Sequence, residues 1–430
     1  MILNKVSMFV WNYFTNDARV MRECKTLSLN SYNVNLIALK NRRINDIKKH
    51  ESFNENFQVF RVEKYSILIE IIFKYKLTMM LLSLVLNILL LVSLFYDLKL
   101  LPLVMVLIAI QLIFITFKKI RSVLINFSTI IRITMKGYSQ HADIYHANDL
   151  NTLPQAIFCA KFRLKRKKLI YDSHEVQSDR TGYNKKLVKF VEGILIKFVD
   201  CMIVENETRA KYNVKLYGFK PKILHNYSEL YDINSYPNSN IHTLLNISPD
   251  EKILLYQGGI QVGRGLDKLI DAMSHIKNGH LVFIGDGNKK ESLKIKAEKS
   301  TEKKRIHFID KVKLSELPSY TKEAYLGFQV LQNICFNHYS ASSNKLFEYI
   351  MAGVPVVACD FPEIAKVVEN NEVGVTINSH DFKEIAIAVN ELLENQKLYN
   401  KYKNNTIQTR AIYNWEEEKY KLLEIYESLR

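Results

Sequence analysis

A lysine and a glutamate stand three residues apart in the stretch SNKLFEYIMAGVPVV, residues 343–357. A serine can cap a helix that begins here, and Gly353 can end it. The unpaired N–H groups of a helix start and the ammonium group of Lys345 both favour an anion. Glu348, one turn further on, can accept hydrogen bonds from vicinal hydroxyls. A phosphate site beside a diol acceptor indicates a nucleotide, whereas an amphipathic helix with an exposed Lys–Glu pair is the alternative.

A glycine-rich loop, YQGGIQVGRGLDKLIDAM, spans residues 256–273. Gly258 and Gly259 follow an expected strand, where they let the backbone come close to a ligand. Arg264 stands at the start of the next helix, where it can clamp a diphosphate with two hydrogen bonds. Lys268 lies one turn later and is counted with the donor-binding residues. Neither a GxGxxG nor a GxxxxGK[ST] fingerprint is present, so the loop predicts a phosphate site of another kind.

The elements that must position these residues alternate between short apolar strands and amphipathic helices, which predicts doubly wound parallel sheets. The strands are expected at 5–11, 34–39, 143–149, 168–174, 201–206, 222–226, 252–257, 280–285, 305–309, 326–331 and 354–359. A polar, irregular stretch at 226–242 reads as the linker between two such domains.

We therefore expect a first domain over residues 1–226, a second over 227–414, and a final helix over 415–430 that packs back on the first domain. Parallel sheets of this kind hold ligands beyond the carboxyl ends of their strands. Two of them facing each other would form a cleft.

Two apolar runs without a charged residue, 77–96 and 100–117, interrupt the first domain. Each approaches the roughly 20 residues that a helix needs to cross a bilayer. Lysines and arginines flank the pair, which predicts that both flanks lie on the cytoplasmic side. We expect an inserted hydrophobic hairpin over 66–137; a buried helix pair and a re-entrant wedge are the alternatives.

Composition narrows the class of partner. The 430 residues include 60 Lys and Arg against 44 Asp and Glu, which gives a net charge of +16 and indicates an anionic partner. Membrane lipids are the economical choice beside an apolar hairpin, and no recognised nucleic-acid module is present. Five scattered cysteines without a CxxC pair fit a reducing compartment. No signal-peptide pattern and no acidic pair suited to a metal ion are found.

Two basic segments of the first domain have alternative interpretations. The run KFRLKRKK, residues 161–168, suits a position near a leaflet or an ordinary solvated loop. The helix expected at 184–199, KKLVKFVEGILIKFVD, carries four lysines beside an apolar side. Its apolar side is expected to be core, and a position on a membrane surface is the alternative.

Taken in order and spacing, several stretches resemble the family 4 glycosyltransferases. The stretches are NDARVMRECKTL (16–27), ADIYHANDLNTLPQA (142–156), LIYDSHE (169–175), YQGGIQVGRGLDKLI (256–270), FIGDG (283–287) and SNKLFEYIMAGVPVV (343–357). The resemblance implies a GT-B fold, in which two Rossmann-like domains face a cleft. It also implies metal-independent hexosyl transfer from a nucleotide-diphosphate sugar, with retention of configuration and no cofactor.

The same resemblance implies the roles of the donor-binding residues. Arg264 and Lys345 would hold the donor's phosphates, and Glu348 would bind the ribose hydroxyls. The loop at Gly258 and Gly259 would approach the pyrophosphate.

It further implies four residues around the reacting groups. Asn148 and Asp149, at the end of an expected strand, would face the donor sugar or the acceptor. His174 and Glu175 would line the same cleft.

The chain departs from the family pattern at several positions. Where many members carry a glutamate that meets the donor sugar, this chain has Ser340. Gly259 replaces a basic residue, so that Arg264 is expected to do more of the phosphate work. Asn148 replaces a histidine, and the loop 12–17 lacks the usual glycines.

The hairpin places the expected acceptor at the inner leaflet of the cytoplasmic membrane, with the catalytic domains on the cytoplasmic side. A polyprenyl-linked or other saccharide acceptor in surface polysaccharide biosynthesis would suit that position. A sugar-nucleotide epimerase of the same fold and a non-catalytic membrane scaffold are the alternatives.

Overall fold

The computed structural model describes residues 4–41, 47–65, 76–93, 99, 101–107, 118–180 and 184–430. The chain divides into two compact units. The N-terminal unit comprises Met1–Asp172 and Ile194–Asp200, and the C-terminal unit comprises Ser173–Gly193 and Cys201–Arg430. A division at residue 226, and the packing of the last helix on the first domain, stay predictions.

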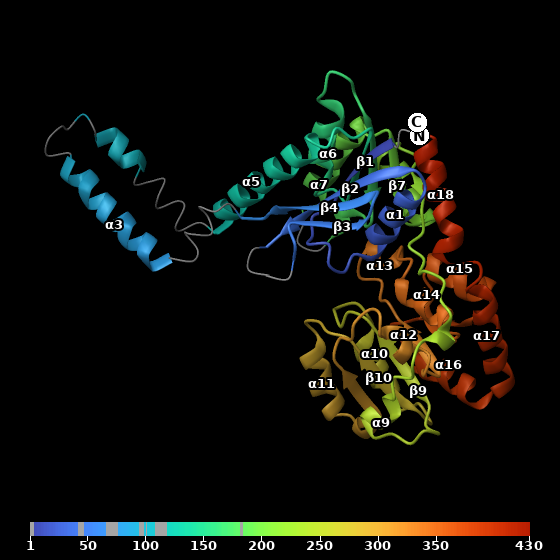
Figure 1. The fold of residues 1–430 in the computed structure, drawn as a ribbon. Helices are drawn as coiled ribbons and strands as arrows, with labels where there is room; N and C mark the ends of the chain where they lie inside the picture. The colour runs from blue at the N-terminus through green and yellow to red at the C-terminus, as the bar shows by residue number, and fades with distance from the viewer. Residues whose placement is uncertain are drawn as a thin grey trace. The chain divides into compact units, whose positions relative to one another are not determined.

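An eight-stranded sheet has the order β3-β4-β2-β1-β5-β6-β7-β8 (Figure 1). Its strands are β1 Asn4–Phe9, β2 Tyr32–Lys40, β3 His50–Asn54, β4 Phe57–Glu63, β5 Ile144–Asn148, β6 Lys168–Ser173, β7 Cys201–Val204 and β8 Lys222–Ile223. The neighbouring pairs from β4 to β6 are parallel, as is β7 with β8, whereas β3 joins β4 antiparallel. The predicted doubly wound sheet is present, and β3 and β4 add an edge that the sequence pattern did not indicate.

Helices connect these strands. They are α1 Ala18–Leu29, α3 Lys76–Ser93, α5 Lys118–Tyr138, α6 Leu153–Lys161, α7 Lys185–Leu195 and α8 Glu207–Tyr217. Asp17 caps α1, because its side chain accepts a hydrogen bond from the N–H of Val20 at 3.2 Å. Strand β5 is buried along its whole length, as expected of a parallel strand covered on both faces.

The expected hydrophobic hairpin lies partly outside the described residues, at 66–75, 94–98, 100 and 108–117. Within the described part, α3 is helical and so are residues 101–107. Among the described residues, no helix combines the length and the apolar character needed to cross a bilayer.

A six-stranded sheet forms the centre of the C-terminal unit, with the order β11-β10-β9-β12-β13-β14 and parallel pairing throughout. Its strands are β9 Ile253–Gln257, β10 His280–Ile284, β11 Ile306–Ile309, β12 Leu326–Gln329, β13 Val356–Cys359 and β14 Gly374–Ile377. Its helices are α9 Ile241–Leu245, α10 Leu266–Ala272, α11 Lys290–Glu298, α12 Leu317–Thr321, α13 Phe336–Tyr339, α14 Asn344–Met351, α15 Pro362–Asn370, α16 Phe382–Glu394, α17 Gln396–Thr409 and α18 Trp415–Glu427.

Alternating side chains of β9 anchor both faces of this sheet. Leu254 and Tyr256 join a core with α10 and α16, whereas Leu255 joins a second core with Phe347 of α14. Alternation with a period of two is what places successive strand residues on opposite faces. The strand order runs outward in opposite directions from β9 and β12. The carboxyl ends of these two strands therefore mark the switch point where such sheets form a ligand crevice.

Candidate functional site

The glycine loop leaves the sheet at the carboxyl end of β9. The N–H of Gly258 donates to the carbonyl of Ile284 at 2.9 Å, and Gly258 has a φ of 121°. A Cβ atom on Gly285 would lie 2.0 Å from the carbonyl oxygen of Gly258. Glycines are thus required on both strands for this close approach, and the Gly258–Gly259 backbone is left exposed for a ligand.

Two glycines in the left-handed region fix the backbone around Arg264. Gly263 and Gly265 have φ values of 76° and 67°. A Cβ atom on Gly263 would lie 2.3 Å from the Ile334 side chain, and one on Gly265 would lie 2.2 Å from the carbonyl oxygen of Val330. The half-buried Arg264 is therefore held in one place just before α10.

Lys345 points into the same loop from the first turn of α14. Its side chain is only 8% exposed, and its Nζ donates to the hydroxyl oxygen of Tyr256 at 3.1 Å. The ammonium group also lies 4.5 Å from the centre of the Tyr256 ring. Tyr256 in turn donates to the carbonyl of Gly259 at 2.8 Å, so that one tyrosine links the lysine to the glycine loop. A Cβ atom on Gly258 would lie 3.6 Å from the Lys345 Nζ.

The positive charges of Arg264 and Lys345 act on each other, and no ion pair of either is found among the described residues. Burial, followed by the positive charge of Arg264, lowers the pKa of Lys345 to about 7, while Glu348 acts in the opposite direction. The Nε atom of Arg264 is buried without a hydrogen-bond partner among the described residues. Two clustered cations beside an open glycine backbone would suit an anion with two negative charges, and we call this arrangement the candidate anion site.

Glu348 is fixed at the edge of this candidate anion site. Its Oε2 accepts from Nε2 of Gln257 at 2.6 Å, and Oε1 of Gln257 accepts from the hydroxyl of Thr321 at 2.8 Å. Gln257 is fully buried and Glu348 is half-buried. The carboxylate thus has a defined position one helical turn from Lys345.

Lys268 was also predicted to bind the donor, but it takes part in none of the contacts described above. It lies half-buried on α10. Within the described part of the chain, no hydrogen bond or ion pair of its ammonium group is found. The structure brings together Gly258, Arg264, Lys345 and Glu348, and the role of Lys268 stays a prediction.

Asn148 and Asp149 lie in the N-terminal unit, at the end of β5. Nδ2 of Asn148 donates to the carbonyl of Phe9 at 3.0 Å, and its buried Oδ1 has no partner among the described residues. Asp149 adopts a left-handed φ of 63°, and its N–H donates to the carbonyl of Asp172 at 2.9 Å. These bonds tie the turn after β5 to β1 and β6.

His174 and Glu175 follow β6 and belong to the C-terminal unit. The backbone carbonyl of His174 accepts from a guanidinium nitrogen of the buried Arg209 at 2.5 Å. Glu175 forms an exposed ion pair with Arg180 at 3.0 Å. Arg209 therefore fixes the backbone at His174, while the Glu175 carboxylate has a surface partner.

Ser340 is buried, although the resemblance suggested a position facing the donor sugar. Its carbonyl accepts from Nδ2 of Asn206 at 2.7 Å, and its Oγ accepts from Nε of Arg209 at 3.3 Å. Arg209 already pairs with Glu205 at 2.6 Å. A second carboxylate at position 340 would compete for the same guanidinium, which explains why a small hydroxyl residue suits this site.

Asn337 on α13 binds the backbone of the segment that follows β6. The N–H of Val176 donates to Oδ1 of Asn337 at 2.8 Å, and Nδ2 of Asn337 donates back to the carbonyl of Val176 at 3.1 Å. The N–H of Asn337 donates to Asp179 at 3.2 Å. The amide therefore pairs with a peptide group as a neighbouring strand would, and it holds the His174–Asp179 segment against α13.

We expect Asn337→Leu to lower the free energy of unfolding by about 1–3 kcal/mol, because the N–H of buried Val176 loses its partner, whereas the Val176 carbonyl keeps the hydrogen bond from the N–H of Asp179. Asn337→Asp should be destabilised at neutral pH, where a carboxylate faces the Val176 carbonyl, and should recover as acid protonates it. Urea unfolding at pH 4 and pH 7 measures both. The control is Asn333→Ala, at an exposed neighbouring position. Equal stability of all variants would contradict a stabilising role of the hydrogen bonds between Asn337 and Val176.

A cavity of about 340 Å³ lies next to the contact between α13 and the His174–Asp179 segment. It is lined by Asp179, Lys185, Asn333, Ile334, Cys335, Phe336 and Tyr339. It includes neither Arg264 nor Lys345, so that the candidate anion site is defined by charge and backbone geometry rather than by an enclosed volume.

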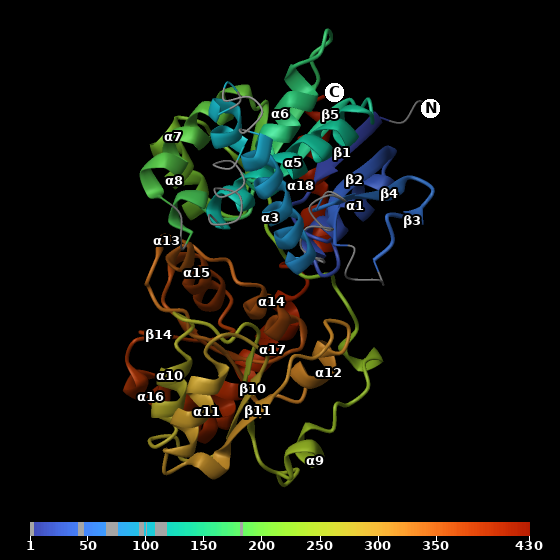
Figure 2. The ribbon, with the colours of Figure 1, turned by 90° about the vertical axis from the view of Figure 1, so that its left-hand side faces the viewer.

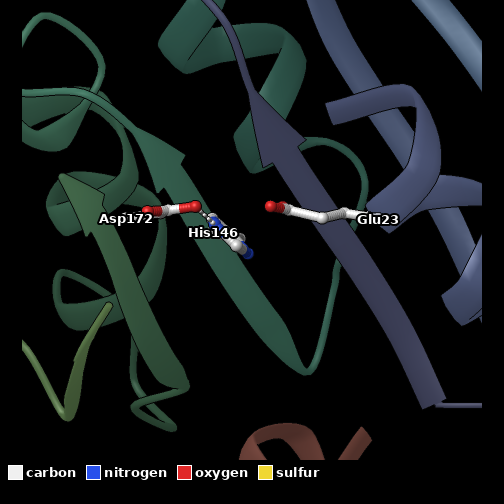
Figure 3. A group of neighbouring side chains, drawn as sticks. All are labelled: Glu23, His146 and Asp172. Atoms are coloured by element: carbon white, nitrogen blue, oxygen red, sulfur yellow. Dashed lines mark ion pairs between the residues drawn. The ribbon is translucent and has the colours of Figure 1, made fainter. Parts of the chain in front are cut away.

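A second polar cluster lies in the N-terminal unit and was not expected from the sequence. Glu23 of α1, His146 of β5 and Asp172 of β6 converge in the core (Figure 3). Arg19 donates two hydrogen bonds to Asp172, at 2.9 and 2.7 Å, and one to Glu23 at 3.1 Å. His146 Nε2 lies 3.9 Å from Asp172.

The spacing of these carboxylate and imidazole atoms would suit a metal ion. Arg19, however, already supplies the positive charge between the two carboxylates, so the cluster fits a buried ion-pair network that joins α1 to β5 and β6. Its sequence signal is the buried Asp172 in an otherwise apolar strand.

Comparisons with known proteins bear on the part of the chain that holds this site. Residues 238–409 match the family model described as "Glycosyl transferases group 1", and this range contains the whole candidate anion site. This part of the C-terminal unit is therefore similar to a glycosyltransferase group 1 domain. A chitobiosyldiphosphodolichol beta-mannosyltransferase from Candida albicans is 28% identical over 274 residues. That match covers 56% of this chain and 58% of the yeast protein.

Solved structures show the same fold over the full chain. Sucrose-phosphate synthase from Thermosynechococcus elongatus superposes with a TM-score of 0.71 at 14% identity, covering 99% of both chains. HepE from Anabaena, solved in complex with UDP, gives a TM-score of 0.67 at 13% identity and covers 99% of this chain and 100% of its own. The chain thus has the two-domain α/β fold of the GT-B glycosyltransferases.

Several residues of the site were not expected from the sequence. Tyr256 and Gln257 stand in the glycine-loop motif, but their partners Lys345 and Glu348 lie about 90 residues away. Arg209 had no local signal at all. The contacts of Tyr256 and Gln257 become visible only where α14 packs against β9.

Proposed function

We propose that this chain transfers a sugar from a nucleotide-diphosphate sugar to an acceptor hydroxyl, with retention of configuration. The observation that carries the proposal is the meeting of Arg264 and Lys345 at the switch point of the second sheet. Lys345 faces the exposed glycine backbone, Arg264 lies close enough to lower the pKa of Lys345, and no ion pair of either is found within the described residues. A diphosphate supplies the two negative charges that this arrangement lacks.

The proposed reaction breaks the bond between the anomeric carbon and the diphosphate oxygen, and the electron pair stays on the diphosphate. Arg264 and Lys345 stabilise this charge as it develops, in the role that a divalent cation takes in other transferases. The acceptor oxygen bonds to the anomeric carbon on the same face, and its proton passes to the departing diphosphate. The sequence resemblance supports retention, and NMR of the product's anomeric proton tests it.

We propose that Glu348 binds the nucleoside and that residues following β5 and β6 lie beside the sugar. A carboxylate fixed by Gln257 is suited to accept two hydrogen bonds from ribose hydroxyls. Asn148 and Asp149 are proposed to face the donor sugar or the acceptor, and His174 is proposed to line the same region.

We further propose a lipid-linked or other saccharide acceptor at the cytoplasmic face of a membrane, with the catalytic residues on that side. The name of the Candida relative describes a saccharide on a lipid diphosphate, and this supports the acceptor class. The apolar runs 77–96 and 100–117 of the sequence support the location.

A thermal-shift panel of nucleotide sugars tests the function directly. A ligand at one hundred times its Kd should stabilise the fold by about 2.7 kcal/mol. Uridine nucleotides come first, because HepE binds UDP. The stabilising donor is then incubated with and without membrane extract. Failure of every donor would reject the proposal, and conversion of the donor without acceptor would indicate an epimerase instead.

Glu348→Gln should weaken donor binding about 10- to 100-fold, since hydrogen bonds to a charged group contribute about 1.5–3 kcal/mol. The sharper measurement is a double-mutant cycle by calorimetry, which pairs this variant with a donor that lacks the ribose 2′-hydroxyl. If Glu348 binds that hydroxyl, removing it should cost the parent protein affinity but cost the variant little. Glu369→Gln, on α15, is the matched control. Additive losses would contradict the assignment.

A further inference from the structure

The apolar side of α7 faces outward rather than into the core, which corrects the expectation from the sequence. Leu187 is 60% exposed and Phe190 is 68% exposed. Val191 and Ile194 are also exposed, and Phe198 continues the row beyond the helix. Residues spaced by three and four lie on one side of a helix, so these side chains form a continuous apolar stripe.

The opposite side of α7 is firmly packed, so the exposure of the stripe is not the result of a loose helix. Val188 and Glu192 are buried. The hydroxyl of Tyr217 on α8 donates to Glu192 at 2.8 Å, and a Cβ atom on Gly193 would lie 3.5 Å from the Tyr217 ring. The two helices lie side by side (Figure 2). The contact with α8 therefore fixes which face of α7 points outward.

Two lysines flank the exposed stripe. The helical spacing places Lys186 and Lys197 on one side of it, whereas Lys189 lies over the Tyr212 ring of α8 at 5.9 Å and Lys185 forms an ion pair with Asp179 at 2.7 Å. The carboxylate of the helix itself, Glu192, is turned inward to Tyr217. The stripe is thus apolar along its centre and positively charged along one flank.

We propose that α7 is an interfacial helix that lies on an anionic lipid bilayer. An apolar stripe with a basic flank buries its side chains at the level of the acyl chains while its lysines meet anionic headgroups. A second copy of this chain is the less suitable occupant, because a two-fold contact would set lysines against lysines over a small apolar area. This inference does not depend on sugar transfer, and it concerns a segment separate from the apolar runs at 77–117.

A local probe tests the proposal, because the full chain could bind vesicles through other segments. Phe190→Trp places an indole on the stripe, and Tyr420→Trp places one on α18, where Tyr420 is 57% exposed. Each emission spectrum is corrected with the parent protein, which contains Trp11 and Trp415. Vesicles carry brominated acyl chains and either phosphatidylglycerol with phosphatidylcholine or phosphatidylcholine alone.

With anionic vesicles, the indole at position 190 should shift to shorter wavelength and be quenched, while the indole at position 420 should change little. The double change Lys186→Glu and Lys197→Glu should remove the response at position 190. Equal behaviour at the two positions would overturn the proposal. So would a concentration-dependent dimer by light scattering without lipid that Phe190→Glu abolishes, because it would assign the stripe to a second copy.

Discussion

Arg264→Ala is expected to lower kcat/KM by about 10²–10³-fold, the loss typical of removing one group that stabilises developing charge. The reason is geometric as well as electrostatic. Gly263 and Gly265 hold the arginine in one backbone conformation, and its buried Nε has no partner among the described residues. The guanidinium is therefore positioned in advance for a bound anion, and the reaction needs no reorganisation of this group.

Two further variants give this experiment its controls. Arg264→Lys keeps the charge but loses the planar fork, so it should restore only part of the activity. Lys268→Ala, on α10, should cost less than Arg264→Ala, because Lys268 lacks the flanking left-handed glycines that fix Arg264. Steady-state kinetics measures kcat/KM of each variant, and calorimetric titration measures the Kd of the donor. A donor Kd of Arg264→Ala equal to that of the parent protein would remove the arginine from the phosphate site.

Much of the second sheet could be predicted because its strands are short apolar runs bounded by glycines. β9, β10 and β13 lie within two residues of their expected limits. The edge strand β14 and the helices α15 and α17 were not expected. β14 is only four residues long, and α17 is polar along most of its length, so neither leaves a strong local pattern. The polar strand β3 likewise forms because β4 offers it an open edge.

The residues of the candidate site also fall into two groups, those that a local sequence pattern marks and those that it does not. Arg264, Lys345 and Glu348 were identified because glycine loops and helix starts leave a local pattern. The buried network of Arg209 with Ser340, and the pairing of Asn337 with Val176, join segments more than 100 residues apart. No local pattern encodes such contacts.

The apolar side of α7 shows another limit of prediction from the sequence. Its periodicity predicted an amphipathic helix correctly, but periodicity cannot tell whether a core or an external surface receives the apolar face. The contact of Glu192 with Tyr217 decides it.

Donor affinity should fall as the pH rises above about 7. Burial, followed by the charge of Arg264, lowers the pKa of Lys345 to about 7 in the unliganded protein. Below that pH the lysine is already charged, and binding should take up no proton. Above it, a bound diphosphate favours the ammonium form and raises the pKa, so binding takes up one proton. The association constant should then drop by up to about tenfold per pH unit until the raised pKa is reached.

The other groups that face Lys345 do not titrate in this window. Burial holds the pKa of Tyr256 and Tyr349 above the usual tyrosine range and raises that of Cys359 to about 12, so these three stay neutral. Burial, with the charges of Arg264 and Lys345, holds the pKa of His338 below its usual range. A pH dependence above 7 therefore reports on the lysine.

Calorimetry of donor binding from pH 6 to pH 9 in buffers of different ionisation enthalpy measures the proton uptake. An intact nucleotide sugar is required, because the terminal phosphate of a free nucleoside diphosphate titrates near pH 6. Lys345→Arg stays charged and should give a flat profile, whereas Lys345→Met should bind weakly at every pH. Lys345→Met should also melt at a higher temperature, since it removes a buried cation without an ion-pair partner among the described residues. Zero proton uptake by the parent protein at pH 8 would show that the diphosphate does not contact Lys345.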